Sequence, residues 1–167
     1  MRLKGLYIED DKKNICVTKK LFEQEGFDLE ALDELPVDLE NLYPLILERN
    51  IDFLLIDHEL NKLVSYTGFD ALNEIRKHDR TIYAVLLTNF EVEDFKEEFG
   101  SYDLEVNKSE LSDDQKLNDI AAKIRRACER IVDSKVLAQV EEQQKIEQQK
   151  LELLKQIEKR LAEKTTD

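Results

Sequence analysis

The stretch that most constrains the fold is residues 53–57, FLLID, in which four large apolar residues are followed by Asp57. An uninterrupted apolar run of this length is typical of a β-strand buried on both faces, as in a parallel sheet covered by helices. In such sheets the functional groups lie just beyond the carboxyl ends of the strands. The sequence therefore predicts that Asp57 lies at a functional edge of a sheet.

Three other apolar runs also end in polar residues. Residues 6–8 lead into Glu9 and Asp10, residues 83–87 into Thr88, and residues 104–106 into Asn107 and Lys108. Because the carboxyl ends of parallel strands meet at one edge, we expect these side chains to gather around Asp57. That edge is the predicted functional site.

The segments between these runs show helical or turn patterns. Apolar residues at helical spacing predict helices over 12–25, 39–49, from Gly68 onward, and over 91–99, and the alternating segment 27–32 predicts a strand nearer the sheet edge. Pro44 would kink the second helix or mark a late start. Five strands alternating with helices predict an α/β fold with a doubly wound, five-stranded parallel sheet.

The last predicted helix begins near residues 113–114 and has no evident end. From 133 to 164 the chain contains neither Gly nor Pro and is dominated by Gln, Glu and Lys. We therefore predict a domain over 1–132 and a C-terminal helical extension over 133–167. One seam of the extension is apolar at both ends and polar in the middle: Val136 and Val140, then Gln143, Glu147 and Lys150, then Leu154, Ile157 and Leu161.

This seam predicts a weak coiled coil, and with it a homodimer formed through the C-terminal helix. The alternative is a solvated single helix held by Glu–Lys pairs.

The amino-acid composition limits the kinds of partner that the protein is expected to bind. The chain has 25 basic and 38 acidic residues and a net charge of -13, which argues against a nucleic-acid surface. Cys16 and Cys128 lack metal-ligand spacing and are expected to be reduced thiols of the core or its margin. No apolar run approaches membrane-spanning length and the N-terminus does not resemble a signal peptide, so we expect a cytoplasmic protein with no membrane partner.

The polar strand ends and the helix after the central strand resemble, in order, the motifs of receiver domains of two-component response regulators. The resemblance covers residues 3–132 and rests on LYIED at 6–10, LID at 55–57, GFDAL at 68–72, LLT at 86–88 and VNK at 106–108. It implies the flavodoxin-like receiver fold. It also implies a phosphoacceptor that carries out self-phosphorylation and autodephosphorylation, rather than an enzyme with turnover.

The resemblance assigns a role to each residue of the site. Asp57 would be the phosphoacceptor, taking a phosphoryl group from a partner histidine kinase or phosphotransfer protein, with Thr88 and Lys108 contacting phosphoryl oxygens. Mg²⁺ would offset the charge of the acids and the phosphoryl group, as oxygen-ligated Mg²⁺ does in phosphoryl transfer. Its ligands would be Asp10 and Asp57 directly, Glu9 through water, and the backbone carbonyl of Glu59.

The chain departs from the family pattern at several positions. Ser109 follows Lys108 where the family has a proline preceded by a cis bond, and a trans bond here is expected to displace Lys108. Glu105 takes the position of the aromatic switch residue, and Asn89 replaces a small residue. The loop after Asp57 is longer and lacks the usual Met-Pro. We therefore expect intact acceptor chemistry and an altered signalling surface.

Two other functions remain open. A pseudo-receiver would use the same fold as a phosphorylation-independent binding or dimerisation module, with vestigial acids. A Mg²⁺-dependent phosphohydrolase would carry a second aspartate two residues after the nucleophile, where this chain has Glu59 and no segment long enough for a cap. Taken singly, Asp10 also suits an ordinary turn or helix cap, and Lys108 a surface lysine.

Overall fold

The structure, a computed structural model, describes residues 2–32, 34–60, 64–89 and 102–164, with side chains up to residue 157. The chain divides into two compact units, Met1–Cys128 and Glu129–Asp167. The sheet and all of the predicted site residues belong to the first unit. None of the helices among the described residues combines the length and the apolar composition that a membrane-spanning helix requires.

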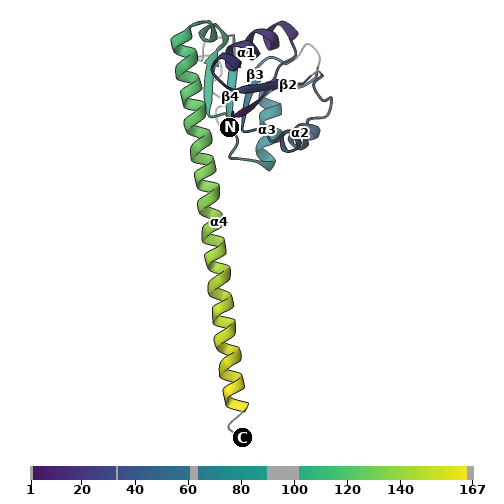
Figure 1. The fold of residues 1–167 in the computed structure, drawn as a ribbon. Helices are drawn as coiled ribbons and strands as arrows, with labels where there is room; N and C mark the ends of the chain where they lie inside the picture. The colour runs from purple at the N-terminus through teal and green to yellow at the C-terminus, as the bar shows by residue number, and fades with distance from the viewer. Residues whose placement is uncertain (1, 33, 61–63, 90–101, 165–167) are drawn as a thin grey trace. The chain divides into compact units, whose positions relative to one another are not determined.

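One fully parallel sheet forms the centre of the first unit (Figure 1). Its strand order is β2-β1-β3-β4-β5. Its described strands are β1 (Lys4–Ile8), β2 (Asp28–Ala31), β3 (Phe53–Asp57), β4 (Tyr83–Thr88) and β5 (Leu104–Asn107). The central place of β3 explains its apolar sequence, because both of its faces and both of its edges are covered. The predicted doubly wound parallel sheet is confirmed, with the alternating segment as an edge strand.

Helices lie between the strands and after the last strand. The described helices are α1 (Lys12–Gln24), η1 (Leu39–Asn41), α2 (Leu42–Arg49), α3 (Gly68–His78), η3 (Lys108–Ser112) and α4 (Asp114–Lys164). Pro44 lies in the first turn of α2, where its missing N–H costs no helical hydrogen bond, so the late start is the outcome that the structure shows. The helix predicted over 91–99 lies outside the described residues.

The two faces of the sheet carry separate hydrophobic cores. Phe53 and Leu55 of β3 point to the face covered by α1 and the start of α4, whereas Leu54 and Ile56 point to the face covered by α2 and α3. This alternation follows from the period of two along a strand. The first core includes Phe22, Phe27, Leu117, Ile120 and Ile124, and the second includes Leu42, Ile46, Leu72 and Ile75.

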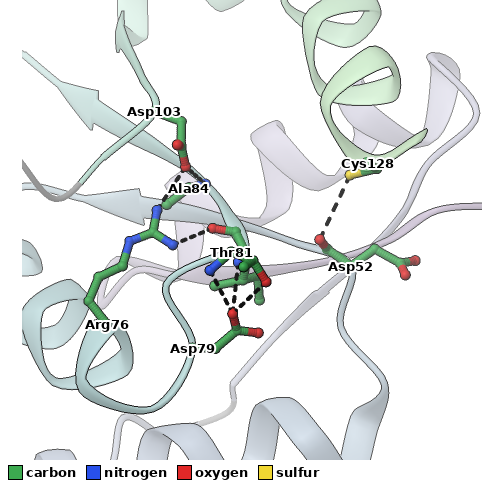
Figure 2. Close-up of polar contacts among 8 residues, drawn as sticks. Asp52, Arg76, Asp79, Thr81, Ala84, Asp103 and Cys128 are labelled. Atoms are coloured by element: carbon green, nitrogen blue, oxygen red, sulfur yellow. Dashed lines mark hydrogen bonds and ion pairs between the residues drawn. The ribbon is translucent and has the colours of Figure 1, made fainter. Parts of the chain in front are cut away.

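At the amino ends of the strands, carboxylates fix the strand starts. Asp103 Oδ2 accepts hydrogen bonds from the Ala84 backbone N–H at 2.8 Å and from Arg76 at 2.7 Å, as Figure 2 shows. Asp52 accepts from the Lys4 backbone N–H at 2.8 Å in the same manner. A buried or half-buried N–H at a strand end needs such an acceptor, and these acids therefore help to set the register of the sheet.

The two cysteines differ in environment. Both are free thiols, and Cys128 is buried, with its Sγ 3.7 Å from the Asp52 carbonyl oxygen (Figure 2). Cys16 is exposed on α1, so the expectation of a core thiol is wrong at that position. It occupies the solvent side of the helix, opposite the buried Phe22 stripe.

In the second unit, residues 129–164 form a continuous helical stretch. Nine large apolar side chains in its described part are solvent-exposed: Val132, Val136, Leu137, Val140, Ile146, Leu151, Leu153, Leu154 and Ile157. The long C-terminal helix is confirmed, and its association with a second helix stays a prediction.

Candidate functional site

The parallel register brings the predicted acids to one edge of the sheet. Ile8 pairs with Ile56, and Asp57 pairs with Leu87, so the residues that follow β1 and β4 flank the end of β3. Buried polar residues cluster there: Glu9, Asp10, Asp57 and Thr88. Buried carboxylates are costly unless they are paired or bind a cation, and so this edge has the chemistry of a site rather than of a core.

Asp57, which is 3% exposed, is the central acid. Its Oδ2 lies 2.8 Å from Lys108 Nζ. Among the described residues, no hydrogen-bond donor reaches its buried Oδ1. Burial raises the pKa of Asp57 to about 6; Lys108 lowers this pKa and the charge of Glu9 raises it. One carboxylate oxygen is thus paired, and the other is left for a ligand.

Glu9 accepts hydrogen bonds on both of its carboxylate oxygens. Its Oε2 accepts from Tyr7 Oη at 2.8 Å and from Lys108 Nζ at 2.9 Å, while its Oε1 accepts the backbone N–H groups of Asp10 and Asp11. Burial raises the pKa of Glu9, but the hydrogen bonds from Lys108, the Asp11 amide and Tyr7 outweigh it, and the pKa lies below its usual value. Glu9 is therefore a fixed negative charge.

Lys108 reaches both acids through a trans peptide. Among the described residues no peptide bond is cis, so the Lys108–Ser109 bond is trans. The expected displacement of Lys108 is wrong, because the chain turns directly into η3, with Asn107 Oδ1 accepting the Ser109 N–H at 2.9 Å. Burial lowers the pKa of Lys108, but Asp57 and Glu9 outweigh burial and raise it, which keeps the side chain a cation.

Three carboxylates are placed to share a metal ion. One oxygen from each of Glu9, Asp10 and Asp57 lies within 4.8 Å of the other two. All three groups are hard oxygen donors, and Asp57 Oδ1 is buried with no donor from the described residues, which fits Mg²⁺. The side chain of Glu59 is exposed, and the role of its carbonyl stays a prediction.

Thr88 ends β4 beside the site. Its side chain is 2% exposed, and its Cα pairs with that of Asn107, the residue before Lys108. From this position the hydroxyl is close to the end of β3. Its predicted role, contact with a phosphoryl oxygen on Asp57, stays a prediction. Asn89, which follows it, is exposed.

The loop after Asp57 is anchored at both ends. The His58 N–H donates to the Leu87 carbonyl at 2.9 Å, and the Gly68 N–H donates to the His58 carbonyl at 3.1 Å. Gly68 packs so closely that a Cβ there would lie 2.0 Å from the Asp57 carbonyl oxygen. Thr67 and Asp70 form a capping box that starts α3 at this point. These contacts tie the residue after Asp57 to the end of β4 and to the start of α3.

Glu105, at the predicted switch position, belongs to a local pair. Its Oε2 accepts a hydrogen bond from Tyr102 Oη at 2.9 Å, and the Tyr102 ring lies 6.0 Å from that of Phe69 on α3. Both Tyr102 and Glu105 are half-buried. The aromatic ring in this region thus comes from the chain just before β5, and not from the strand position itself.

Sequence reasoning missed two members of the site. Tyr7 and Asn14 both donate to Glu9 Oε2, at 2.8 and 3.3 Å. The signal for Tyr7 was present, since residues i and i+2 of a strand share a face and a phenol two residues before an acid can reach it. Asn14 comes from the first turn of α1, and its approach depends on the path of the β1–α1 loop.

Solved structures of other proteins share this fold. The chain has the receiver fold, with a five-stranded parallel sheet and a long C-terminal helix. A CheY-like response regulator receiver domain from Methylobacillus flagellatus matches at 20% identity, with a TM-score of 0.57, covering 74% of this chain and 99% of that one.

Two further solved structures are also similar. The response regulator TrrA from Thermotoga maritima, in complex with Mg²⁺-BeF, matches at 20% identity and a TM-score of 0.59, covering 74% of this chain and 99% of that one. A fusion carrying residues 181–211 of the yeast Spc42 trimeric coiled coil matches at 20% identity and a TM-score of 0.60, covering 92% and 94%. No protein-family model and no curated protein matches the sequence.

Proposed function

We propose that this protein is a phosphoaccepting receiver of a phosphorelay, in which Asp57 takes a phosphoryl group from a histidine kinase or phosphotransfer protein. The observation that carries the proposal is the juxtaposition at Asp57: one buried oxygen paired to Lys108, and the other without a donor from the described residues and next to two further acids. This is the arrangement that an aspartyl nucleophile for an anionic group needs.

The reaction moves one phosphoryl group between two nucleophiles. An Asp57 carboxylate oxygen attacks phosphorus, the O–P bond forms, and the N–P bond of the phosphohistidine breaks with its electron pair returning to the imidazole nitrogen, which binds a proton. Little covalent work falls to the protein, and its residues position the groups and offset their charge. The product is an acyl phosphate, which water can hydrolyse.

The acids Glu9, Asp10 and Asp57 would hold Mg²⁺, Asp10 and Asp57 directly and Glu9 through water, with the Glu59 carbonyl as a further ligand. When bound, Mg²⁺ supplies the positive charge that lets an acid approach an anionic phosphoryl group. Lys108 would exchange part of its contact with Asp57 for a phosphoryl oxygen, and the Thr88 hydroxyl would donate to another. Glu9 would keep Lys108 in place throughout.

The pseudo-receiver is the second candidate. The pair between Tyr102 and Glu105 favours it, because the position expected to couple phosphorylation to a buried ring holds a carboxylate that is already bonded. In that case the acids and Lys108 would serve only as a buried ion-pair cluster.

Phosphorylation by small donors separates these functions. Acetyl phosphate or phosphoramidate with Mg²⁺ should add one phosphoryl mass to the intact protein, and Asp57→Asn should abolish the addition. The control is Asp28→Asn, which changes an exposed acid at the start of β2 and should leave labelling intact. If the wild type takes up no phosphoryl group and does not bind beryllofluoride, the pseudo-receiver is favoured. If Asp57→Asn is still phosphorylated, the phosphoacceptor is another residue.

The output of the domain is proposed to pass through the C-terminal helix, as a homodimer of the cytoplasmic protein. Nine large apolar side chains of this helix are exposed between Val132 and Ile157. A helix gains most of its stability from packing an apolar face against another element, so this helix is expected to need a partner. The similarity to a coiled-coil fusion supports an associating helix. The net charge of -13 supports a protein partner over a nucleic acid.

Sedimentation of the full chain and of a chain ending after residue 132 tests the homodimer. We expect association that is lost on truncation. A full-length monomer at high micromolar concentration, with and without beryllofluoride, would contradict self-association and leave a different partner helix.

A further inference from the structure

Tyr7 places a buried phenol beneath the candidate site. The residue is 1% exposed and its ring packs in the core with Phe22, Phe27 and Phe53. Its hydroxyl donates to Glu9 Oε2 at 2.8 Å. A buried phenol is placed where its O–H has a partner, and here the partner is a buried carboxylate, so the bond is charge-assisted.

The bond matters because of how the oxygens of Glu9 are shared. Oε1 accepts the N–H groups of Asp10 and Asp11 at 3.1 and 3.0 Å, and Oε2 accepts from Tyr7, Lys108 and Asn14. A carboxylate offers about four lone-pair sites. Five donors share these sites, so the orientation of the Glu9 carboxylate is fixed from both sides.

The same Oε2 atom joins Tyr7 to Lys108. Tyr7 approaches from the core and Lys108 from the start of η3, and Lys108 Nζ then continues to Asp57 Oδ2 at 2.8 Å. A continuous path of short contacts therefore runs from the core phenol to the acid at the end of β3.

We propose that Tyr7 is a positioning residue, whose hydroxyl orients the Glu9 carboxylate so that Oε2 holds Lys108 beside Asp57. The consequence for phosphoryl transfer rests on the proposed function; the positioning of Lys108 does not. The competing explanation is that Tyr7 only fills the core and that its hydroxyl bond adds stability without affecting Lys108.

Tyr7→Phe separates the two explanations, because it keeps the ring and removes only the donor. The matched control is Tyr83→Phe. Tyr83 is a half-buried tyrosine at the start of β4, so it lies at the amino ends of the strands and away from the site. The first measurement is the Lys108 ammonium signal in a nitrogen–proton NMR spectrum, assigned with Lys108→Gln, with neither Mg²⁺ nor a phosphodonor present. We expect this signal to shift or broaden in Tyr7→Phe and to stay unchanged in Tyr83→Phe.

The second measurement is the rate of phosphorylation by phosphoramidate beside the Mg²⁺ dissociation constant. We expect Tyr7→Phe to slow phosphorylation by about tenfold, the effect of losing one charge-assisted bond, while Mg²⁺ binding through Asp10 and Asp57 is retained. A purely structural role would lower the thermal midpoint and leave both the Lys108 signal and the rate unchanged.

A double-mutant cycle with Glu9→Gln tests whether Tyr7 acts through Glu9. In the Glu9→Gln background, Tyr7→Phe should not alter the Lys108 signal further. An unchanged Lys108 signal in folded Tyr7→Phe overturns the inference, as does an equal effect in both backgrounds. If Tyr7→Phe does not fold, the inference is tested by the Tyr7 ring signals in Glu9→Gln, which must shift. If the wild type takes up no phosphoryl group but the Lys108 signal responds, the proposed function fails and the positioning role stands.

Discussion

Lys108 Nζ lies 2.8 Å from Asp57 Oδ2, across a peptide bond to Ser109 that is trans. The same ammonium lies 2.9 Å from Glu9 Oε2, so one cation offsets two buried acids. This relationship links the stability of the domain to its proposed chemistry, because a change in any of the three charges alters the cost of burying the other two.

Lys108→Gln should destabilise the first unit. The substitution leaves Asp57 and Glu9, which are 3% and 2% exposed, with no ammonium between them. Removing one member of a buried ion pair costs about 3 kcal/mol, measured as a loss in the free energy of unfolding by urea titration. Adding Asp57→Asn should recover part of the loss. The control Lys116→Gln, in an exposed pair with Glu110, should have no measurable effect, and an equal effect would contradict the prediction.

Asp57→Asn should stabilise the fold at high pH and less so at low pH. The pKa of Asp57 is raised from 3.8 to about 6, first by burial, so between these values the folded state binds more protons than the unfolded state. The wild type therefore loses stability as the pH rises through that window, and a neutral side chain does not. The gain at pH 8 should be on the order of 1–3 kcal/mol. Urea titrations at about pH 4 and about pH 8 measure it; a larger gain at the lower pH would contradict the sign.

Mg²⁺ should raise the thermal midpoint of the wild type more than that of Asp10→Asn. Three acids within 4.8 Å repel one another, and a bound cation stabilises the folded state by about 1.4 kcal/mol at ten times its Kd. Without metal, Asp10→Asn should be the more stable protein. Glu59→Gln is the matched control, because it removes an exposed side chain and keeps the backbone carbonyl. Equal Mg²⁺ shifts in wild type and Asp10→Asn would place the metal elsewhere.

Gly68→Ala should destabilise the fold by moving Asp57. A Cβ on Gly68 would lie 2.0 Å from the Asp57 carbonyl oxygen, a backbone atom that moves only with the end of β3. We expect a loss of about 2 kcal/mol, typical of overpacking, together with slower phosphorylation. Asn73→Ala, on the exposed side of α3, should be neutral or stabilising because Ala is the better helix former. A Gly68→Ala protein as stable as the wild type would show that the loop adapts freely.

Much of the architecture was predictable from local patterns. The run at 53–57 identified the central strand, and the polar ends of four strands identified the edge where Glu9, Asp57 and Lys108 meet. These features are determined by sequence because burial on both faces demands apolar side chains and because parallel strands end at one edge. The late start of α2 was one of the two outcomes expected of Pro44.

The detailed contacts depended on the folded structure. The trans bond at Lys108–Ser109 does not displace the lysine, because η3 and the Asn107 cap bring the chain back. The hydrogen bond between Tyr7 and Glu9 could not be predicted without the rotamers and the burial of both side chains. The contact between Asn14 and Glu9 depends in the same way on the path of the β1–α1 loop.

The sequence by itself determined which residue types reach the carboxyl edge of the sheet, since their positions at the ends of parallel strands suffice for that. Only the tertiary structure decided which oxygen of Glu9 faces Lys108 and which oxygen of Asp57 is left for a ligand. Those choices follow from packing between segments up to 99 residues apart, where sub-ångström differences in backbone position select one hydrogen bond over another.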